Sequence, residues 1–381
     1  MFIKEKETLA IEITSRCIRV LSLKKIKSNY ELTSFAEVPF QNSSNSIRLN
    51  DNEELVNALK TAIKISKFKN KNASIYISDK EIFEKEFLFD YSMEVYDIEI
   101  KLENDIRKIV PFDSKEEVSF DFAIVNNTSK NLSPKGNPKN LLKDLFKRDK
   151  AVEESVLPEK KKVLFSACKK SSIDEVCGFI KKAGLNPVIV EAEKYCVQRG
   201  YEEFVLPQIL DFTYEDLVAY VDIGDNGIKF KIFKGTDIIY GKDFGNGGNE
   251  LTKIISSEYS ISNVEAERIK CNTSSQNTEF EDEIMVPYRK RVMESVKSGL
   301  QNFYSSTEYS NVHYVVLAGG GSNITSMKTE FEKYFSLPIY LADPVSSIIL
   351  NKKVDRDTTY SKSSSIIGLL GLGVRELRSD Y

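Results

Sequence analysis

Apolar residues along this chain follow two spacings that alternate in the sequence. In LAIEITSRCIRVLSLKK (residues 9–25), apolar stretches flank a short polar turn, which is typical of a β-hairpin. In LVNALKTAIKISK (residues 55–67), apolar positions recur every three or four residues, which predicts an amphipathic helix. The stretch ASIYIS (residues 73–78) then predicts a strand. Strands and helices that alternate in this way indicate an α/β fold.

The hairpin pattern returns in AYVDIGDNGIKFKIFKG (residues 219–235), and helical patterns follow it in LTKIISSEY and SNVEAERIK. Each copy has a carboxylate, a turn of small or polar residues and a second strand with alternating apolar residues. The positions that align are Glu12 with Asp222, Ile13 with Ile223, Ile18 with Ile228, and Arg19 with Lys229. Two copies of one unit predict two related lobes with a cleft between them.

A third pattern lies further along, in VHYVVLAGGGSNITSMKTEF (residues 312–331). The apolar run to Ala318 predicts a buried strand, and Ser322 or Asn323 could cap the helix that follows. The glycines between them have two interpretations. Three absent side chains permit close approach of a ligand, and free amides at a helix start favour an anion. Alternatively, the chain only makes a tight turn here.

Two more helices have clear signals. Ser262 and Glu265 form an S-x-x-E capping box, which places a helix start there. Apolar residues at helical spacing predict a long helix from about Glu283 to Ser305, before the glycine turn.

Composition narrows the class of protein. The net charge of −3 argues against a general nucleic-acid binder, and no apolar run approaches the ~20 residues that span a membrane. The first residues lack the apolar core of a signal peptide. The five cysteines form no CxxC motif and are odd in number, so neither a zinc site nor a disulfide framework is indicated. We expect a reduced, cytoplasmic protein.

Three stretches resemble motifs of the actin-like ATPase superfamily: VDIGDNG (221–227), AERIK (266–270) and LAGGGSN (317–323). The first resembles a phosphate-binding hairpin, the second a helix that contacts ribose and base, and the third a turn beneath the adenosine. The resemblance implies an α/β protein with two actin-like lobes, which are duplicated ribonuclease H-like domains. It also implies ATP or ADP, with Mg²⁺, in the cleft.

The resemblance also implies which residues form the site. Glu12 and Asp222 would hold Mg²⁺ through its water molecules. For Gly247 and Gly248 a plain turn is an alternative to a place in the cleft, and no catalytic residue is implied. The residues implied to bind nucleotide are Thr14, Ser15, Arg16, Asp222, Gly224, Asp225, Asn226, Gly227, Gly247, Gly248, Glu267, Lys270, Gly319, Gly320, Gly321 and Ser322.

The first hairpin departs from the superfamily pattern, in which Asp-Ile-Gly is usual. This chain has Glu12, Ile13 and Thr14 instead. The longer Glu12 changes the reach towards a metal-bound water, and the β-branch of Thr14 resists a positive φ. Arg16 could compensate by binding phosphate, or it could simply face solvent. We therefore expect nucleotide binding with weak or absent hydrolysis.

Within the superfamily, nearly the whole chain resembles the PilM family of type IV pilus machines. The most telling part is YDIEIKLENDIRKIVPFDSKEEVSFDF (96–122), where an amphipathic helix stops at Pro111. The stretches SLPIYLADP (336–344) and IIGLLGLGVREL (366–377) also fit. The FtsA family shares the architecture, including an inserted subdomain, but usually ends in a basic amphipathic membrane helix. We expect no such helix here, which favours PilM.

These patterns predict domain boundaries. We expect the first lobe at residues 1–86 and 169–212, the inserted subdomain at 87–168, and the second lobe at 213–381. Residues 249–307 would form a peripheral part of the second lobe. Residues 127–162 have ten Lys or Arg against five Asp or Glu, and we expect a mobile loop there.

The resemblance implies a cytoplasmic scaffold that binds the N-terminal tail of a PilN-like inner-membrane protein. The tail would lie as an extended peptide in a groove between the first lobe and the inserted subdomain, near Pro111 and Phe112. The scaffold would reach the membrane through its partners. Contact with the pilus motor ATPase and a homo-oligomer are left open. The alternatives are an FtsA-like division scaffold and a small-molecule kinase of the superfamily, for which no convincing catalytic carboxylate is present.

Overall fold

The computed structural model describes residues 8–40, 53–125, 160–271 and 278–378. Two compact units divide the chain: Met1–Ile77 with Val176–Tyr381, and Ser78–Glu175. The range predicted for the inserted subdomain, 87–168, falls inside the second unit. Most of the predicted loop, 127–162, lies outside the described residues, but its last three residues, Lys160–Lys162, belong to a strand.

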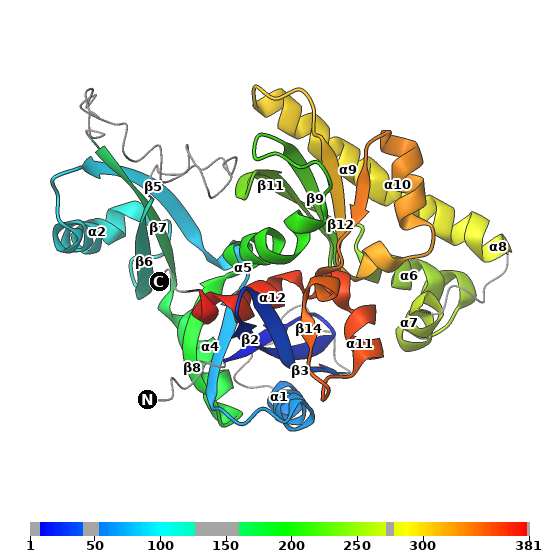
Figure 1. Ribbon diagram of the computed structural model, residues 1–381, viewed down its shortest axis with the longest axis horizontal. Coiled ribbons are helices and arrows are strands. Elements are labelled where there is room, and N and C mark those ends of the chain that lie inside the picture. Colours follow the sequence, from blue (N-terminus) through cyan, green and yellow to red (C-terminus); the bar gives the residue numbers. More distant parts are fainter. Residues whose placement is uncertain (1–7, 41–52, 126–159, 272–277, 379–381) are drawn as a thin grey trace, which may run out of the picture. The chain divides into compact units, whose positions relative to one another are not determined.

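The first lobe is built on a six-stranded sheet with the order β14-β3-β2-β1-β4-β8 (Figure 1). Its strands are β1 (Leu9–Ile13), β2 (Cys17–Ile26), β3 (Asn29–Pro39), β4 (Asn72–Ile77), β8 (Asn186–Ala192) and β14 (Ile349–Leu350). β1, β2 and β3 are antiparallel, whereas β4 runs parallel to β1 and β8 to β4. Glu12 pairs with Arg19 and Ile13 with Ile18, which confirms the predicted hairpin.

The second lobe has a five-stranded sheet with the order β11-β10-β9-β12-β13. Its strands are β9 (Leu217–Ile223), β10 (Ile228–Lys234), β11 (Asp237–Phe244), β12 (Tyr314–Ala318) and β13 (Ile339–Leu341). Asp222 pairs with Lys229 and Ile223 with Ile228, so the two hairpins match residue for residue. β12 is the predicted strand before the glycines, and its last four residues are buried.

The two sheets repeat one topology. Each begins with three antiparallel strands joined in sequence, and two further strands add parallel to the first of them. In this order β3-β2-β1-β4-β8 corresponds to β11-β10-β9-β12-β13. The predicted α/β fold of two duplicated lobes is therefore confirmed.

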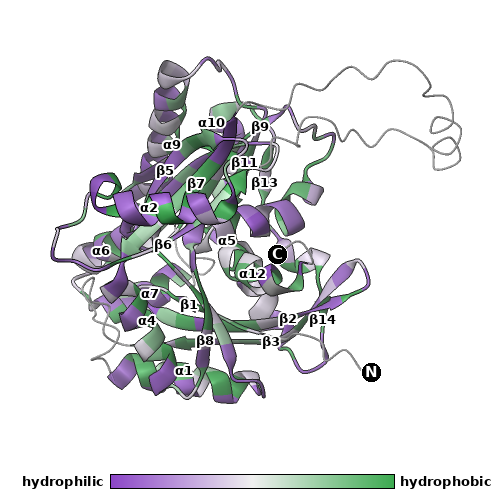
Figure 2. Ribbon diagram, turned by 90° about the vertical axis from the view of Figure 1, so that its left-hand side faces the viewer, coloured by the Kyte–Doolittle hydropathy of each residue, from purple (hydrophilic) through white to green (hydrophobic). Residues whose placement is uncertain are grey.

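Helices of several kinds accompany the two sheets. They are α1 (Glu53–Ser66), α4 (Lys170–Lys182), α5 (Glu193–Gly200), α6 (Gly248–Tyr259), α7 (Asn263–Cys271), α8 (Thr278–Phe280), α9 (Val286–Ser306), α10 (Met327–Phe335), α11 (Arg356–Ser361) and α12 (Ile367–Val374). The buried, apolar α12 differs from amphipathic ones such as α1. α7 starts as its capping box predicts, because the Glu265 amide donates to the Ser262 hydroxyl at 3.2 Å. α1 shows alternating hydrophilic and hydrophobic residues along the ribbon (Figure 2), and its apolar face packs on β2 and β3.

The segment after β13 returns to the first lobe. Its short strand β14 pairs with β3, and α12 packs beside Ala10, Leu21 and Leu23 of the first sheet. α12 also crosses α5 at very close range. A Cβ on Gly371 would lie 1.9 Å from the carbonyl oxygen of Cys196, so only glycine allows this crossing.

The second unit is a three-stranded antiparallel sheet with one helix. Its elements are β5 (Phe83–Asp90), α2 (Val95–Ile109), β6 (Val118–Val125) and β7 (Lys160–Lys169), in the strand order β5-β7-β6. α2 buries Ile98 and Leu102 against Phe165 of the sheet and ends at Ile109, with extended Val110 between it and Pro111, so the helix stops before the proline as predicted. Among the described residues, no helix is long and apolar enough to cross a membrane.

Candidate functional site

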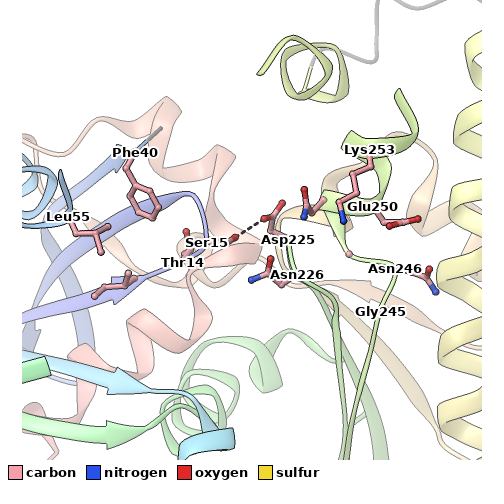
Figure 3. A pocket seen from close by; sticks show the side chains of 13 residues that line it. Thr14, Ser15, Phe40, Leu55, Asp225, Asn226, Gly245, Asn246, Glu250 and Lys253 are labelled. Atoms are coloured by element: carbon pink, nitrogen blue, oxygen red, sulfur yellow. Dashed lines mark hydrogen bonds between the residues drawn. The ribbon is translucent and has the colours of Figure 1, made fainter. Parts of the chain in front are cut away.

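The tips of the two hairpins meet between the lobes. Ser15 in the first tip donates a hydrogen bond from Oγ to Asp225 Oδ2 at 2.6 Å (Figure 3). Arg16 donates from Nε to the other carboxylate oxygen, Asp225 Oδ1, at 2.7 Å. The Asp225 carboxylate of the second tip is therefore held by two donors of the first.

Arg16 extends beyond Asp225 to two helices of the second lobe. Its Nη1 lies 3.2 Å from Glu267 Oε2 on α7, and its Nη2 donates to Asn249 Oδ1 on α6 at 3.3 Å. Its side chain is 30% exposed, so it is neither buried nor free in solvent. The sequence suggested that Arg16 binds phosphate or faces solvent. In this structure its side chain bridges the two lobes, which neither interpretation included.

The first tip satisfies the amides of Thr14, Arg16 and Cys17 within itself. Thr14 Oγ1 accepts hydrogen bonds from the amides of Arg16 at 3.1 Å and Cys17 at 2.9 Å. The Thr14 amide donates to the Cys17 carbonyl at 2.9 Å. A glycine at position 14 would leave the first two amides open to an anion, so the hydroxyl of Thr14 closes part of this tip.

The second tip lies against the turn that precedes α6. The amide of Gly248 donates to the carbonyl of Gly224, and the amide of Asn249 to that of Asp225, each at 2.9 Å. An added Cβ on Gly247 would lie 2.3 Å from the amide nitrogen of Gly227. The predicted glycines Gly247 and Gly248 thus support the second tip, and these two amides at the start of α6 are already bonded.

Three carboxylates lie near the base of the hairpins. Glu12 forms an ion pair with Arg19 at 3.2 Å and accepts a hydrogen bond from the hydroxyl of Tyr76. Burial raises the pKa of Asp222 to about 6, which the nearby Lys229 opposes. The third carboxylate, Glu193, forms an ion pair with Lys229.

The sequence analysis did not identify Glu193 as a residue of this site. The available signal was an acidic residue that directly follows a strand, at the start of a helix between the two lobes. Within the described part of the chain, no group of three or more Asp, Glu, His or Cys side chains is arranged to hold a metal ion.

The three glycines of the turn differ in their surroundings. Gly319 has φ of +79°, and a Cβ there would lie 2.3 Å from Asp222 Oδ1. A Cβ on Gly321 would lie 2.3 Å from Cγ2 of Ile223. These two glycines are needed for packing on the second hairpin. Around Gly320 no atom lies within 4 Å of an added Cβ, so Gly320 alone faces open space.

The predicted cap at Ser322 or Asn323 is wrong. The turn continues as a short 3₁₀-helix over Gly320–Asn323, and α10 begins only at Met327. The hydroxyl of Ser322 instead donates to the Gly319 carbonyl at 2.7 Å, and Asn323 donates to the hydroxyl of Ser364 at 2.9 Å. The hydroxyl of Ser322 therefore stabilises the turn through a hydrogen bond within it.

Glu267 and Lys270, which the resemblance predicts to contact ribose and base, form an ion pair on α7. Lys270 Nζ is 2.7 Å from Glu267 Oε2 and donates to the Gly248 carbonyl at 3.1 Å. Thr252 donates to the same Glu267 oxygen at 2.6 Å. The pair is thus joined to the start of α6, beside the second tip.

A cavity of about 550 Å³ opens at the two tips, with walls from both lobes (Figure 3). This size is in the range of small-ligand pockets. Its lining is mostly polar, with Ile13, Phe40 and Leu55 as apolar exceptions. The lining residues are Ile13, Thr14, Ser15, Phe40, Leu55, Asp225, Asn226, Gly245, Asn246, Gly247, Asn249, Glu250 and Lys253.

The two residues predicted for the partner groove belong to the second unit. Pro111 is exposed directly after α2. Phe112 is half-buried and packs partly on the core of its own unit.

Comparisons with known proteins agree with this geometry. The family model of the type IV pilus assembly protein PilM matches residues 10–141 and 146–377. The chain resembles the structure of a PilM-PilN type IV pilus biogenesis complex with a TM-score of 0.72 and 15% identity, over 98% of this chain and 99% of that one. It also resembles the ethanolamine utilization protein EutJ from Carboxydothermus hydrogenoformans, with a TM-score of 0.51 and 11% identity, over 98% and 90% of the two chains.

A match to a cell division protein covers a smaller part of the chain. The cell division protein FtsA of Buchnera aphidicola is 28% identical in an alignment of length 186, which covers 41% of this chain and 43% of that protein. The match therefore spans less than half of either chain, whereas the PilM model matches nearly all of this one. This chain belongs to the family of the type IV pilus assembly protein PilM.

Proposed function

We propose that the chain is a nucleotide-binding scaffold of the type IV pilus inner-membrane platform, which binds the N-terminal tail of a PilN-like membrane protein. The family match over residues 10–141 and 146–377 carries this proposal. The similarity to PilM in the PilM-PilN complex supports the choice of partner. Partners would hold the scaffold at the cytoplasmic face of the membrane, and contacts with the motor ATPase or a second copy belong to the same proposal.

The peptide would bind in an extended form at the inserted subdomain, near Pro111 and Phe112. Side-chain pockets give such recognition its specificity, while the peptide backbone contributes affinity. Pro111 is exposed and Phe112 retains a partly exposed ring, so both side chains can contribute apolar surface to a peptide.

The cleft fits an adenine nucleotide in several respects. Gly320 leaves open space beside the turn, and the Glu267–Lys270 pair stands near the second tip. Ser15 and Arg16 supply a hydroxyl and a guanidinium that suit phosphate oxygens. Bound ATP or ADP would add negative charge between the lobes, and Asp222 and Glu12 would meet Mg²⁺ only through water.

Hydrolysis is expected to be weak or absent. Glu12 already pairs with Arg19, and the hydroxyl of Thr14 holds the amides of the first tip. Removing one preorganised donor from a catalytic site typically lowers the rate ~10²-fold or more. Nucleotide would therefore act mainly by holding the lobes together and tuning the affinity for a partner.

The test is a titration of the full chain with a fluorescent ATP analogue and Mg²⁺, with and without a PilN-like N-terminal peptide. We expect saturable peptide binding that nucleotide changes. Phe112→Ala should weaken peptide binding, whereas Tyr259→Ala, at an exposed aromatic residue of α6, should not. No peptide binding under either condition would contradict the scaffold, and phosphoryl transfer to an added small substrate would favour a kinase.

A further inference from the structure

We propose that Arg16 and Asp225 form a latch between the lobes, and that this latch competes with nucleotide phosphate for the donors of the first tip. The competition rests on the proposed nucleotide binding, whereas the latch does not. The first observation is the geometry at Asp225. Its two oxygens accept bonds from Ser15 Oγ at 2.6 Å and Arg16 Nε at 2.7 Å.

A carboxylate held in this way resembles a bound phosphate. Guanidinium groups bind carboxylate and phosphate with the same planar donor geometry, and a hydroxyl adds one more donor. While both remain on Asp225, Ser15 has no second hydrogen to donate and Nε of Arg16 is occupied, so neither of these donors is available to a nucleotide phosphate. Asp225 acts as an acidic ligand that the protein itself provides.

Arg16 also reaches the helix predicted to contact the ribose. From Asp225 it continues to Glu267 at 3.2 Å and to Asn249 at 3.3 Å. One side chain of the first lobe thus joins the second tip to α6 and α7. The guanidinium lies between residues predicted to bind phosphate and residues predicted to bind ribose.

The charges around Arg16 are balanced without nucleotide. Arg16 and Lys270 face Asp225 and Glu267, which gives two positive and two negative groups. Both carboxylates would repel a triphosphate placed here. The triphosphate would therefore bind only if Arg16 turned from Asp225 towards it. The side chains of Arg16, Asp225 and Glu267 are 30%, 21% and 26% exposed, so water can weaken the pairs and the latch can open.

The latch is tested by the distance between the lobes, without nucleotide. Pulsed electron paramagnetic resonance would measure the distance between two spin labels, one at exposed Lys60 of α1 and one at exposed Glu258 of α6. The labels would be attached to unnatural amino acids, so that the native cysteines stay unlabelled. Arg16→Gln and Asp225→Asn should each broaden the distance distribution. The double variant should add little beyond either single one, because both changes break one contact.

The matched control is Arg356→Gln, which removes one positive charge from an exposed position of α11. It should leave the distribution unchanged, and circular dichroism should show that all variants are folded. If Arg16→Gln and Asp225→Asn give the distribution of the unaltered protein, there is no latch.

The competition is tested by nucleotide affinity. Asp225→Asn should bind the fluorescent ATP analogue about five- to tenfold more tightly, because Ser15 and Arg16 are released and one negative charge is lost. Unchanged or weaker binding would overturn the competition. If no variant binds nucleotide, the nucleotide part of the proposed function fails with it, and the distance measurement still decides the latch.

Discussion

The side-chain oxygen of Thr14 accepts a hydrogen bond from the amide of Cys17 at 2.9 Å, inside the tip of the first hairpin. The amide of Arg16 donates to the same oxygen. Thr14→Gly should free both amides and tighten binding of the ATP analogue about fivefold, which corresponds to one net hydrogen bond of about 1 kcal/mol. Thr14→Ser keeps the hydroxyl and should bind like the unaltered protein. Equal affinity of the glycine and serine variants would contradict this role of the hydroxyl.

The glycine turn allows packing and ligand binding to be separated. Gly320→Ala places a methyl group in open space, so we expect normal stability and weaker nucleotide binding. Gly321→Ala forces its methyl group against Ile223 and should lower the melting temperature instead. Thermal denaturation and nucleotide titration of both variants check this. If Gly320→Ala binds nucleotide normally, the base does not lie against this turn.

The raised pKa of Asp222 leads us to expect that the stability of the protein depends on pH. Burial raises its pKa from 3.8 to about 6, so between these values the folded protein binds a proton that the unfolded chain does not. Stability from this group therefore falls as the pH rises from about 4 to 6, and the full cost, at most about 3 kcal/mol, is present above pH 6. Asp222→Asn should be more stable than the unaltered protein at pH 8, with a difference that vanishes below pH 4. Denaturant unfolding at several pH values measures it, and a difference independent of pH would refute it.

Arg199 and Glu191 form an ion pair that is only 5% and 7% exposed. Arg199 also donates to the Gly371 carbonyl at 2.8 Å, and Glu191 contacts Arg375 at 2.9 Å. Arg199→Met leaves a buried carboxylate with one cation fewer, so we expect a loss of about 3 kcal/mol in the free energy of unfolding. Denaturant titration would show it. Lys333→Met, in an exposed pair on α10, is the control and should change little. A loss below about 1 kcal/mol for Arg199→Met would mean that Arg375 is sufficient for Glu191.

The hairpins were predictable because local rules determine them. Alternating apolar residues around a short polar turn predicted both hairpins, and the copies aligned Glu12 with Asp222 and Arg19 with Lys229. The structure gives the two hairpins matching registers, with Glu12 opposite Arg19 and Asp222 opposite Lys229. The capping box at Ser262 was correct for the same reason, since cap and helix are adjacent in sequence. Glu267 and Lys270 form an ion pair on one turn of α7, while their contact with ribose and base stays a prediction.

The contacts of Arg16 could not be predicted in the same way. Asp225 is 209 residues away in the sequence, and the pair exists only because two lobes close on each other. The contacts of Glu12 with Arg19 and Tyr76 were likewise not predictable, whereas its expected role towards Mg²⁺ stays a prediction. Ser322 failed as a cap because the glycines allow a 3₁₀ turn, which uses its hydroxyl before the helix starts.

The return of the chain to the first lobe affects the order in which the protein can fold during synthesis. β14 completes the first sheet beside β3, and Val345, Ile348 and Leu369 complete its core beneath Leu21. These residues leave the ribosome after the whole sheet of the second lobe has been made. The first lobe must therefore wait, with part of its apolar core uncovered, until the second is nearly finished. Neither lobe is a free-standing module that could be exchanged by cutting the chain between them.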